Sequence, residues 1–301
     1  MELWIPITIF AAFTQNLRSS LQKYLKGRLS TAGSAFSRFL YGAPLALLYI
    51  YGLMEFGDYS APDINLDFLS AIAIGGLAQI LATSLLVHIF SYRNFVVGTT
   101  FSKTETVQTA IFGLVVLGET ISFGATMGIL VSLVGVLMIS ITRKIASLGD
   151  IARQCVEIPA LMGVASGALF GVAAIGVRAA SLSLESGDFI IRAAMTLACM
   201  LVFQTILMGL YLKFREPGQI SAVLTSWRVS SLVGLTGMLG SVGWFTAMTL
   251  QNAAYVRALG QIELVFTFMV SYLAFRERLS RSELGGIVLV TIGILILIFS
   301  Q

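Results

Sequence analysis

One apolar run of this chain carries charged residues in its middle. The run extends from about residue 94 to residue 117 and is long enough to cross a bilayer, which takes about 20 helical residues at a rise of 1.5 Å each. It contains the sequence TTFSKTE at residues 99–105. A charge near the middle of the membrane costs about 2.5–3.5 kcal/mol on insertion scales. We therefore expect Lys103 and Glu105 to face partners or water rather than lipid.

Composition places the rest of the chain in the same environment. Of the 301 residues, 57% are hydrophobic and 11% are charged, and the mean hydropathy is +0.90. A soluble domain carries about 25% charged residues, which cover its surface. The net charge of +4 would indicate nucleic acid only if basic residues clustered on a soluble face, and here they lie in short connections. We predict a multi-pass protein of the cell inner membrane that contacts the lipid bilayer and binds no nucleic acid.

Other compositional signals exclude several classes of site. The two cysteines, Cys155 and Cys199, form neither a disulfide framework nor a metal pattern. We expect no metal and no cofactor. Residues 1–3 lead directly into apolar sequence without a cationic start or a small-residue cleavage site, so we expect a retained first helix.

Hydropathy predicts an all-α integral membrane protein with ten transmembrane helices. The interior of a bilayer offers no hydrogen-bond partners, so backbone N–H and C=O groups must pair within a helix or a closed barrel. Spans this long and this apolar are helices. The segment of residues 143–158 is expected to be a connecting loop, and residues 213–228 to hold at most a short surface helix. The ten predicted spans are residues 3–23, 31–54, 67–90, 94–117, 121–142, 159–180, 188–212, 229–251, 254–275 and 282–300.

The two halves of the chain repeat each other at an offset of 158 residues. This offset superposes Glu105 on Glu263 and Lys103 on Gln261. Five helices per repeat is an odd number, so residues 159–301 are expected to enter the membrane upside down relative to residues 1–142. Inverted repeats of this kind place a site near the midplane of the membrane. The offset also superposes Asn94 on Asn252, Thr109 on Thr267, Glu119 on Glu277, Ser122 on Ser280, Gly128 on Gly286 and Gly135 on Gly293.

Regularly spaced glycines indicate where helices approach each other closely. Gly163, Gly167 and Gly171 recur every fourth residue. A second series recurs every third residue, at Gly234, Gly237, Gly240 and Gly243. Small-residue stripes of this kind are packing features of membrane bundles, and none follows a strand as a phosphate-binding loop would.

A repeated glutamate-and-glycine pattern connects the chain to a known family. The sequence GETIS at residues 118–122 is followed by Gly128 and Gly135, and RERLS at residues 276–280 by Gly286 and Gly293. This pattern resembles the signature of the EamA branch of the drug/metabolite transporter superfamily. The resemblance implies ten helices in two five-helix repeats, and a transporter. The family often carries a proline after the preceding glutamate, where this chain has Thr106 and Leu264.

Charge bias and resemblance disagree about the orientation of the chain. Basic residues crowd the odd-numbered connections, whereas the even-numbered ones are acidic, so the positive-inside rule places both termini outside. The resemblance implies termini inside for many members. We favour the charge bias. The basic residues concerned are Lys23, Lys26, Arg28, Arg93, Arg143, Lys144, Arg153, Lys213, Arg215, Arg228, Arg276, Arg278 and Arg281.

The residues near the centres of the fourth and ninth spans are the main candidates for function. Lys103 and Glu105 are two positions apart, so they point to nearly opposite faces and are poor partners for each other. Glu105 and Glu263 either hold the repeats together through hydroxyl and backbone groups or handle substrate and protons. Lys103 has no basic counterpart in the second half, which favours a role in substrate binding.

Other spans add polar residues to this set. Gln15 and Arg18 share one face of the first span, and either line water or mark the end of that span. His88, the only histidine, is a candidate for proton coupling or an interfacial side chain. Arg38 and Arg192 are expected to open their spans as surface anchors. The remaining candidate substrate-binding residues are Gln79, Thr83, Trp244, Tyr255 and Gln261.

Taken together, these features predict a secondary transporter and not an enzyme. Buried cations beside carboxylates suit a small polar substrate with charges of both signs, such as an amino acid, which a proton gradient would export by alternating access. No nucleotide-binding loop is present in the sequence. A multidrug exporter of hydrophobic cations is the alternative, and an intramembrane enzyme is a weaker one. We expect a monomer or a homodimer.

Overall fold

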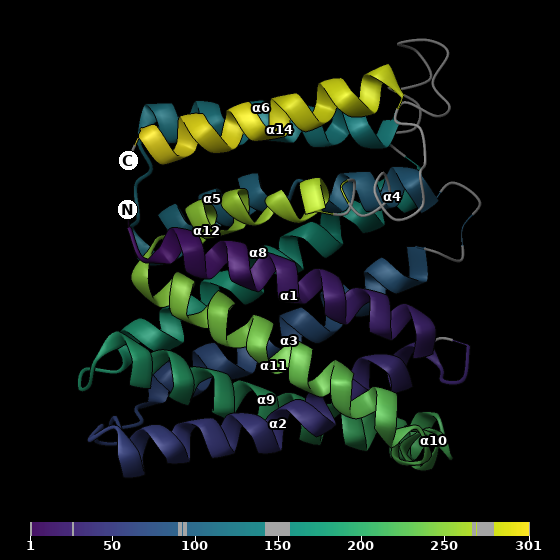
Figure 1. The fold of residues 1–301 in the computed structure, drawn as a ribbon, viewed down its shortest axis with the longest axis vertical. Coiled ribbons are helices and arrows are strands. Elements are labelled where there is room, and N and C mark those ends of the chain that lie inside the picture. The colour runs from purple at the N-terminus through teal and green to yellow at the C-terminus, as the bar shows by residue number, and fades with distance from the viewer. Residues whose placement is uncertain are drawn as a thin grey trace. The chain divides into compact units, whose positions relative to one another are not determined.

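The structure is a computed structural model that describes residues 2–25, 27–89, 92, 95–141, 157–266, 269 and 280–300. All regular secondary structure in these residues is helical, which confirms the all-α prediction (Figure 1). Six of the described helices are long and apolar enough to cross a membrane. The number of ten spans stays a prediction, because the ends of the fifth and ninth predicted spans fall outside the described residues.

The first half of the chain contains long helices and one divided span. The fourth predicted span, at residues 94–117, is split into two helices, α4 (Phe95–Ser102) and α5 (Glu105–Leu117). The undivided helices lie within a few residues of their predicted ranges, because the length of the apolar sequence sets them. They are α1 (Trp4–Leu25), α2 (Thr31–Phe56), α3 (Leu66–Ile89) and α6 (Phe123–Ile141).

The second half follows the same plan. A short helix, α10 (Gln219–Thr225), occupies the connection that was expected to hold at most a short one. The ninth predicted span begins with α12 (Ala253–Gly260) and turns before residues 262–266, which are helical again. The long helices are α8 (Ile158–Ser183), α9 (Phe189–Arg215), α11 (Trp227–Leu250) and α14 (Arg281–Phe299).

The chain forms two compact units, and each unit combines helices from both halves of the sequence. Unit 1 comprises Met1–Leu77 and Gly176–Gln251, and unit 2 comprises Ala78–Ile175 and Asn252–Gln301. The boundaries pass through α3 and α8, so these two helices contribute to both units.

In unit 1, α11 packs against α1, α2 and α9. The glycine stripe of α11 faces α1 and α2. A β-carbon on Gly240 would lie 3.0 Å from the Thr14 hydroxyl oxygen, and one on Gly243 would lie 2.8 Å from the Ala11 β-carbon. These approaches confirm that the stripe brings helices close together.

In unit 2, α6 and α14 lie side by side (Figure 1). Their contact uses the glycines of the repeated signature in reciprocal pairs. A β-carbon on Gly128 would lie 2.7 Å from the Gly293 carbonyl oxygen, and one on Gly135 would lie 2.7 Å from the Gly286 carbonyl oxygen. Only a residue without a side chain permits backbones to approach so closely. The signature glycines thus join the last helix of one half to the last helix of the other.

The Gly-Glu of the first signature forms a tight turn. Gly118 ends α5 in the left-handed region with a φ of 68°, where glycine has no steric cost. The amide of Glu119 donates a 3.1 Å hydrogen bond back to the carbonyl of Gly113. Ser122 then caps α6 by accepting a hydrogen bond from the Ala125 amide at 3.1 Å. This geometry supports a structural role for the turn around Glu119.

Several residues on which the predictions depend lie outside the described residues. Thr267 and Glu277, the repeat counterparts of Thr109 and Glu119, belong to this group, as does Asn94. So do Cys155 and most of the basic residues on which the orientation rests, and the placement of both termini outside stays a prediction. Those basic residues are Lys26, Arg93, Arg143, Lys144, Arg153, Arg276 and Arg278.

Candidate functional site

The first element of the site is the break between α4 and α5. The helical pattern stops at Lys103 and Thr104, whose amides donate to the carbonyls of Thr100 and Phe101 three residues earlier, at 3.0 and 3.2 Å. No proline is needed for this break. Because of it, Lys103 stands at the C-terminal end of α4. Glu105 becomes the first residue of α5. The helix dipole favours a cation such as Lys103 at the C-terminus of α4 and an anion such as Glu105 at the N-terminus of α5.

A second break stands at the corresponding position of the other half. Helix α12 ends at Gly260, and the amide of Gln261 donates to the carbonyl of Ala258 at 3.2 Å. Arg257 lies in the last turn of α12, where a cation is favoured. Glu263 is the second residue of the helical stretch that follows. Each break therefore has a cation at the end of one helix and an acid at the start of the next.

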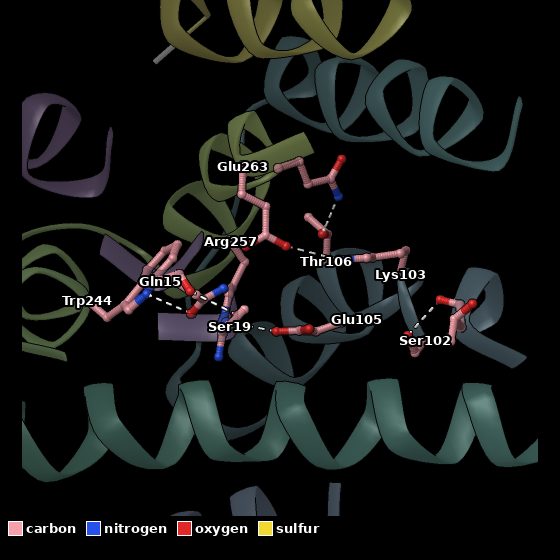
Figure 2. A network of polar contacts seen from close by, with 11 residues as sticks. Gln15, Ser19, Ser102, Lys103, Glu105, Thr106, Trp244, Arg257 and Glu263 are labelled. Atoms are coloured by element: carbon pink, nitrogen blue, oxygen red, sulfur yellow. Dashed lines mark hydrogen bonds and ion pairs between the residues drawn. The ribbon is translucent and has the colours of Figure 1, made fainter. Parts of the chain in front are cut away.

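The four charges form two ion pairs inside unit 2 (Figure 2). Lys103 Nζ lies 3.1 Å from Glu263 Oε1. Arg257 Nε lies 3.0 Å from Glu105 Oε1. The acid of each half thus meets a cation of the other half, as the packing of α5 against α12 allows. Lys103 and Glu105 have different partners, as their positions on opposite faces predicted.

These pairs are partly buried rather than sealed. The Arg257 and Glu105 side chains are each 18% exposed, whereas Lys103 is 36% and Glu263 23% exposed. Two cations and two carboxylates give the cluster no net charge. The Lys103–Glu263 pair is the more accessible of the two, so a ligand can compete for its charges at a lower desolvation cost.

Gln261 supports the second break. Its amide nitrogen donates to the Thr106 hydroxyl at 2.7 Å, and its amide oxygen accepts from the Ser132 hydroxyl at 2.5 Å. The side chain is buried and joins α5 to α6. Gln261 therefore fixes the helices that carry Glu105 and Glu263. Its direct contact with substrate stays a prediction.

Tyr255 lies on α12, two residues before Arg257. Its hydroxyl accepts a hydrogen bond from the Ser122 amide at 3.2 Å, and the ring is buried. This bond ties α12 to the turn between α5 and α6. Substrate binding by Tyr255 also stays a prediction.

Unit 1 contains a second group of predicted residues. The Trp244 indole nitrogen on α11 donates to the Gln15 side-chain oxygen on α1 at 3.1 Å (Figure 2). Arg18 lies one turn further along α1, with its side chain against Gly237 of α11. The structure therefore brings Gln15, Arg18 and Trp244 to one helix interface, α1 against α11.

The remaining predicted residues lie on α3. Thr83 donates its hydroxyl to the carbonyl of Gln79 at 2.8 Å, a bond within the helix. His88 is exposed at the end of α3 and packs edge-on against Tyr92, with ring centroids 5.8 Å apart. This position fits the interfacial interpretation of His88. Its role in proton coupling, like substrate binding by Gln79 and Thr83, stays a prediction.

Sequence patterns did not predict the contacts of three arginines. Arg257 occupies the position that the repeat offset assigns to Thr99, so symmetry did not select it. Arg178 donates from Nη1 to the carbonyls of Met248 and Gln251, both at 2.7 Å, at the C-terminal end of α11. Arg38 does not open its helix as expected: it is the eighth residue of α2 and donates to the Ser241 hydroxyl at 3.2 Å.

Comparisons with known proteins agree with this architecture. Residues 2–141 and 158–299 each match the EamA-like transporter family. Among curated proteins, no relative matches. A solved structure described only as a crystal structure of a protein is similar over 99% of this chain and 97% of that one. The TM-score is 0.68 at 12% sequence identity. At this identity the similarity concerns the fold alone.

Proposed function

Because this protein belongs to the EamA-like transporter family, we propose that it is a secondary active transporter that exports small polar metabolites such as amino acids. The family membership and the apolar helices make it a multi-pass membrane protein. The proposed substrate class rests on the two ion pairs at the helix breaks of unit 2, each of which joins one half of the sequence to the other. Alternating access would follow from rocking of the inverted repeats around such a site.

A substrate with one cation and one anion suits a cluster with no net charge. The ammonium group of the substrate can replace Lys103 as the ion-pair partner of Glu263. The carboxylate of the substrate then forms an ion pair with Lys103. Every charge then keeps a partner during the exchange, which avoids leaving an ion alone in a medium of low dielectric constant. A hydrophobic cation that paired with Glu263 would leave Lys103 without an anionic partner, because such a cation has no carboxylate.

Proton coupling is the second part of the proposal. Protonation of Glu105 or Glu263 would release its cation and change the pairing, which gives a proton gradient a point of action. The lack of a nucleotide-binding loop in the sequence leaves a gradient as the source of energy. Transport that ignores a pH gradient across the membrane would contradict this part alone.

Uptake into proteoliposomes tests the proposal directly. The purified protein, reconstituted with a pH gradient, is expected to move at least one labelled amino acid from a panel of all common ones faster than empty vesicles do. A panel without any signal above empty vesicles would overturn the assignment of substrate class.

Lys103→Ala separates amino acids from hydrophobic cations as substrates. We predict that this variant loses most amino-acid transport, because Glu263 is left without its ion-pair partner and the substrate carboxylate without Lys103. Exposed Lys213 on α9 provides the matched control, and Lys213→Ala is expected to transport normally. Uptake of a fluorescent hydrophobic cation is measured in parallel. Cation transport by the wild type, improved in Lys103→Ala, would support the multidrug alternative instead.

A further inference from the structure

Hydrogen bonds within unit 1 join two connections that are far apart in the sequence. The hydroxyl of Ser30, at the start of α2, donates to a carboxylate oxygen of Glu216, and its amide donates to the side-chain oxygen of Gln219 at 3.0 Å. Glu216 directly follows α9, and Gln219 is the first residue of α10. Helix α10 packs against α2, α9 and α11 (Figure 1). The connection between α1 and α2 is therefore held beside the connection between α9 and α11.

The charge around these two connections is positive. Residues 19–37 and 205–230 contain a single acid, Glu216, and this acid accepts the hydrogen bond from Ser30. The other acids of unit 1 lie where α1 and α9 begin and around the connection from α2 to α3: Glu2, Glu55, Asp58, Asp63, Asp67, Glu185 and Asp188. Exposed basic side chains among the described residues lie in the joined connections or at the adjoining helix ends: Arg28, Lys213, Arg215 and Arg228.

Three of these cations lie over exposed aromatic rings. The pairs, with the distance from the cationic group to the ring centre, are Arg28 and Tyr24 at 5.8 Å, Lys213 and Phe214 at 5.7 Å, and Arg228 and Trp227 at 5.7 Å. An exposed ring beside a cation suits the surface of a membrane, where the ring reaches the acyl chains and the charge reaches the headgroups. We call the four cations and the three rings the basic rim.

We infer that the basic rim binds the headgroups of anionic phospholipids. A zwitterionic headgroup carries no net charge to offset four cations, whereas an anionic headgroup does. Each basic residue near an anionic membrane surface strengthens binding by about fivefold. Arginine also binds phosphate oxygens through two parallel hydrogen bonds, which adds geometric selectivity to the attraction. The inference does not depend on the proposed transport function, and the charge bias places the rim at the cytoplasmic leaflet.

Fluorescence quenching by brominated lipids tests the inference at the rim itself, because brominated acyl chains quench a tryptophan that they contact. Trp227 is 57% exposed, whereas the other two tryptophans, Trp4 and Trp244, are 3% and 8% exposed. The full-length protein is reconstituted in mixtures of phosphatidylcholine and phosphatidylglycerol in which one of the two lipids is brominated, and competition gives their relative affinity. Trp227→Phe measures the signal of the two buried tryptophans, which is subtracted.

Phosphatidylglycerol is expected to bind at the rim about fivefold or more tightly than phosphatidylcholine. This preference should fall as salt is added, because salt screens exposed charges. Equal affinity of the two lipids in the wild type would overturn the inference.

Three variants separate the charge of the rim from other effects. A variant in which all four basic residues of the rim are replaced by Gln is expected to bind both lipids almost equally. Exchanging Arg for Lys and Lys for Arg at the same four positions keeps the charge and should keep most of the preference. Glu55→Gln/Asp58→Asn changes the net charge away from the rim and should leave the preference unchanged. A preference that survives in the Gln variant would overturn the inference.

Discussion

Glu105→Ala is expected to lower the free energy of unfolding by about 3–5 kcal/mol, the cost of breaking a buried ion pair. The reason is that Arg257, whose side chain is only 18% exposed, keeps its charge and loses a carboxylate 3.0 Å away. Reversible unfolding in mixed micelles measures this difference. The matched control is Glu185→Ala, which removes an exposed acid from a connection and should change stability by less than about 0.5 kcal/mol.

The double variant Glu105→Met/Arg257→Met separates lost pairing from lost volume. Two apolar side chains of similar size remove both charges, and such replacements are often neutral or stabilising. The double variant should therefore regain most of the stability that Glu105→Ala loses. A single variant as stable as the wild type, or a double variant no more stable than the single one, would contradict the ion pair seen in unit 2.

Gly135→Val is expected to destabilise the protein by about 3 kcal/mol, the upper end of the range for overpacked cores. Its β-carbon would lie 2.7 Å from the Gly286 carbonyl oxygen and 2.7 Å from the Val290 amide nitrogen. Both contacts are backbone atoms, so α6 and α14 would have to separate to accommodate the side chain. Thermal unfolding in detergent, followed by the loss of a monodisperse peak, detects the change.

Gly52→Ala is the control, and it is expected to change the stability in the opposite direction. A β-carbon at this position in α2 would meet nothing within 4 Å. Alanine should stabilise the helix by about 0.5–1 kcal/mol, because it restricts the unfolded chain. If Gly135→Val unfolds at the temperature of the wild type, the contact between α6 and α14 is not the close approach described above.

Most of the helical framework could be predicted from the sequence, because apolar length and capping residues act locally. The spans that became α2, α6 and α14 were placed within a few residues of their observed bounds. The glycine stripes within residues 163–171 and 234–243 predicted close packing, whereas only the structure shows that Gly128 and Gly135 pair with Gly293 and Gly286. Partner choice depends on which helices are neighbours in space, and no spacing within one half contains that information.

The breaks at Lys103 and Gln261 were not predicted, since neither break contains a proline, although Gly260 is the last residue of α12. The charges themselves were the available signal. A cation followed two residues later by an acid suits the end of one helix and the start of the next better than the interior of a continuous helix. In the second half, Arg257 and Glu263 carry the same order of charge across Gln261.

The N-cap of α2 places Arg38 inside that helix rather than at its start. Ser30 caps α2 and accepts a hydrogen bond from the Gly33 amide, so the helix begins at Thr31 and Arg38 lies a further two turns inside it. Its contact with α11 is a tertiary feature. The Arg18 and Arg38 side chains meet because α11 lacks a side chain at Gly237, which only the packing of α1 and α2 against α11 makes visible.

We propose that the more accessible ion pair of unit 2, Lys103–Glu263, takes part in transport and does not merely hold helices together. Lys103→Met/Glu263→Met tests it, because the double variant removes both charges and should keep the fold. Amino-acid uptake is measured in proteoliposomes that contain equal amounts of the variant or the wild type. The thermal stability of the variant is first shown to equal that of the wild type. Uptake at the level of empty vesicles is expected. A stable double variant that transports the same amino acids at the wild-type rate would show that the pair is structural only.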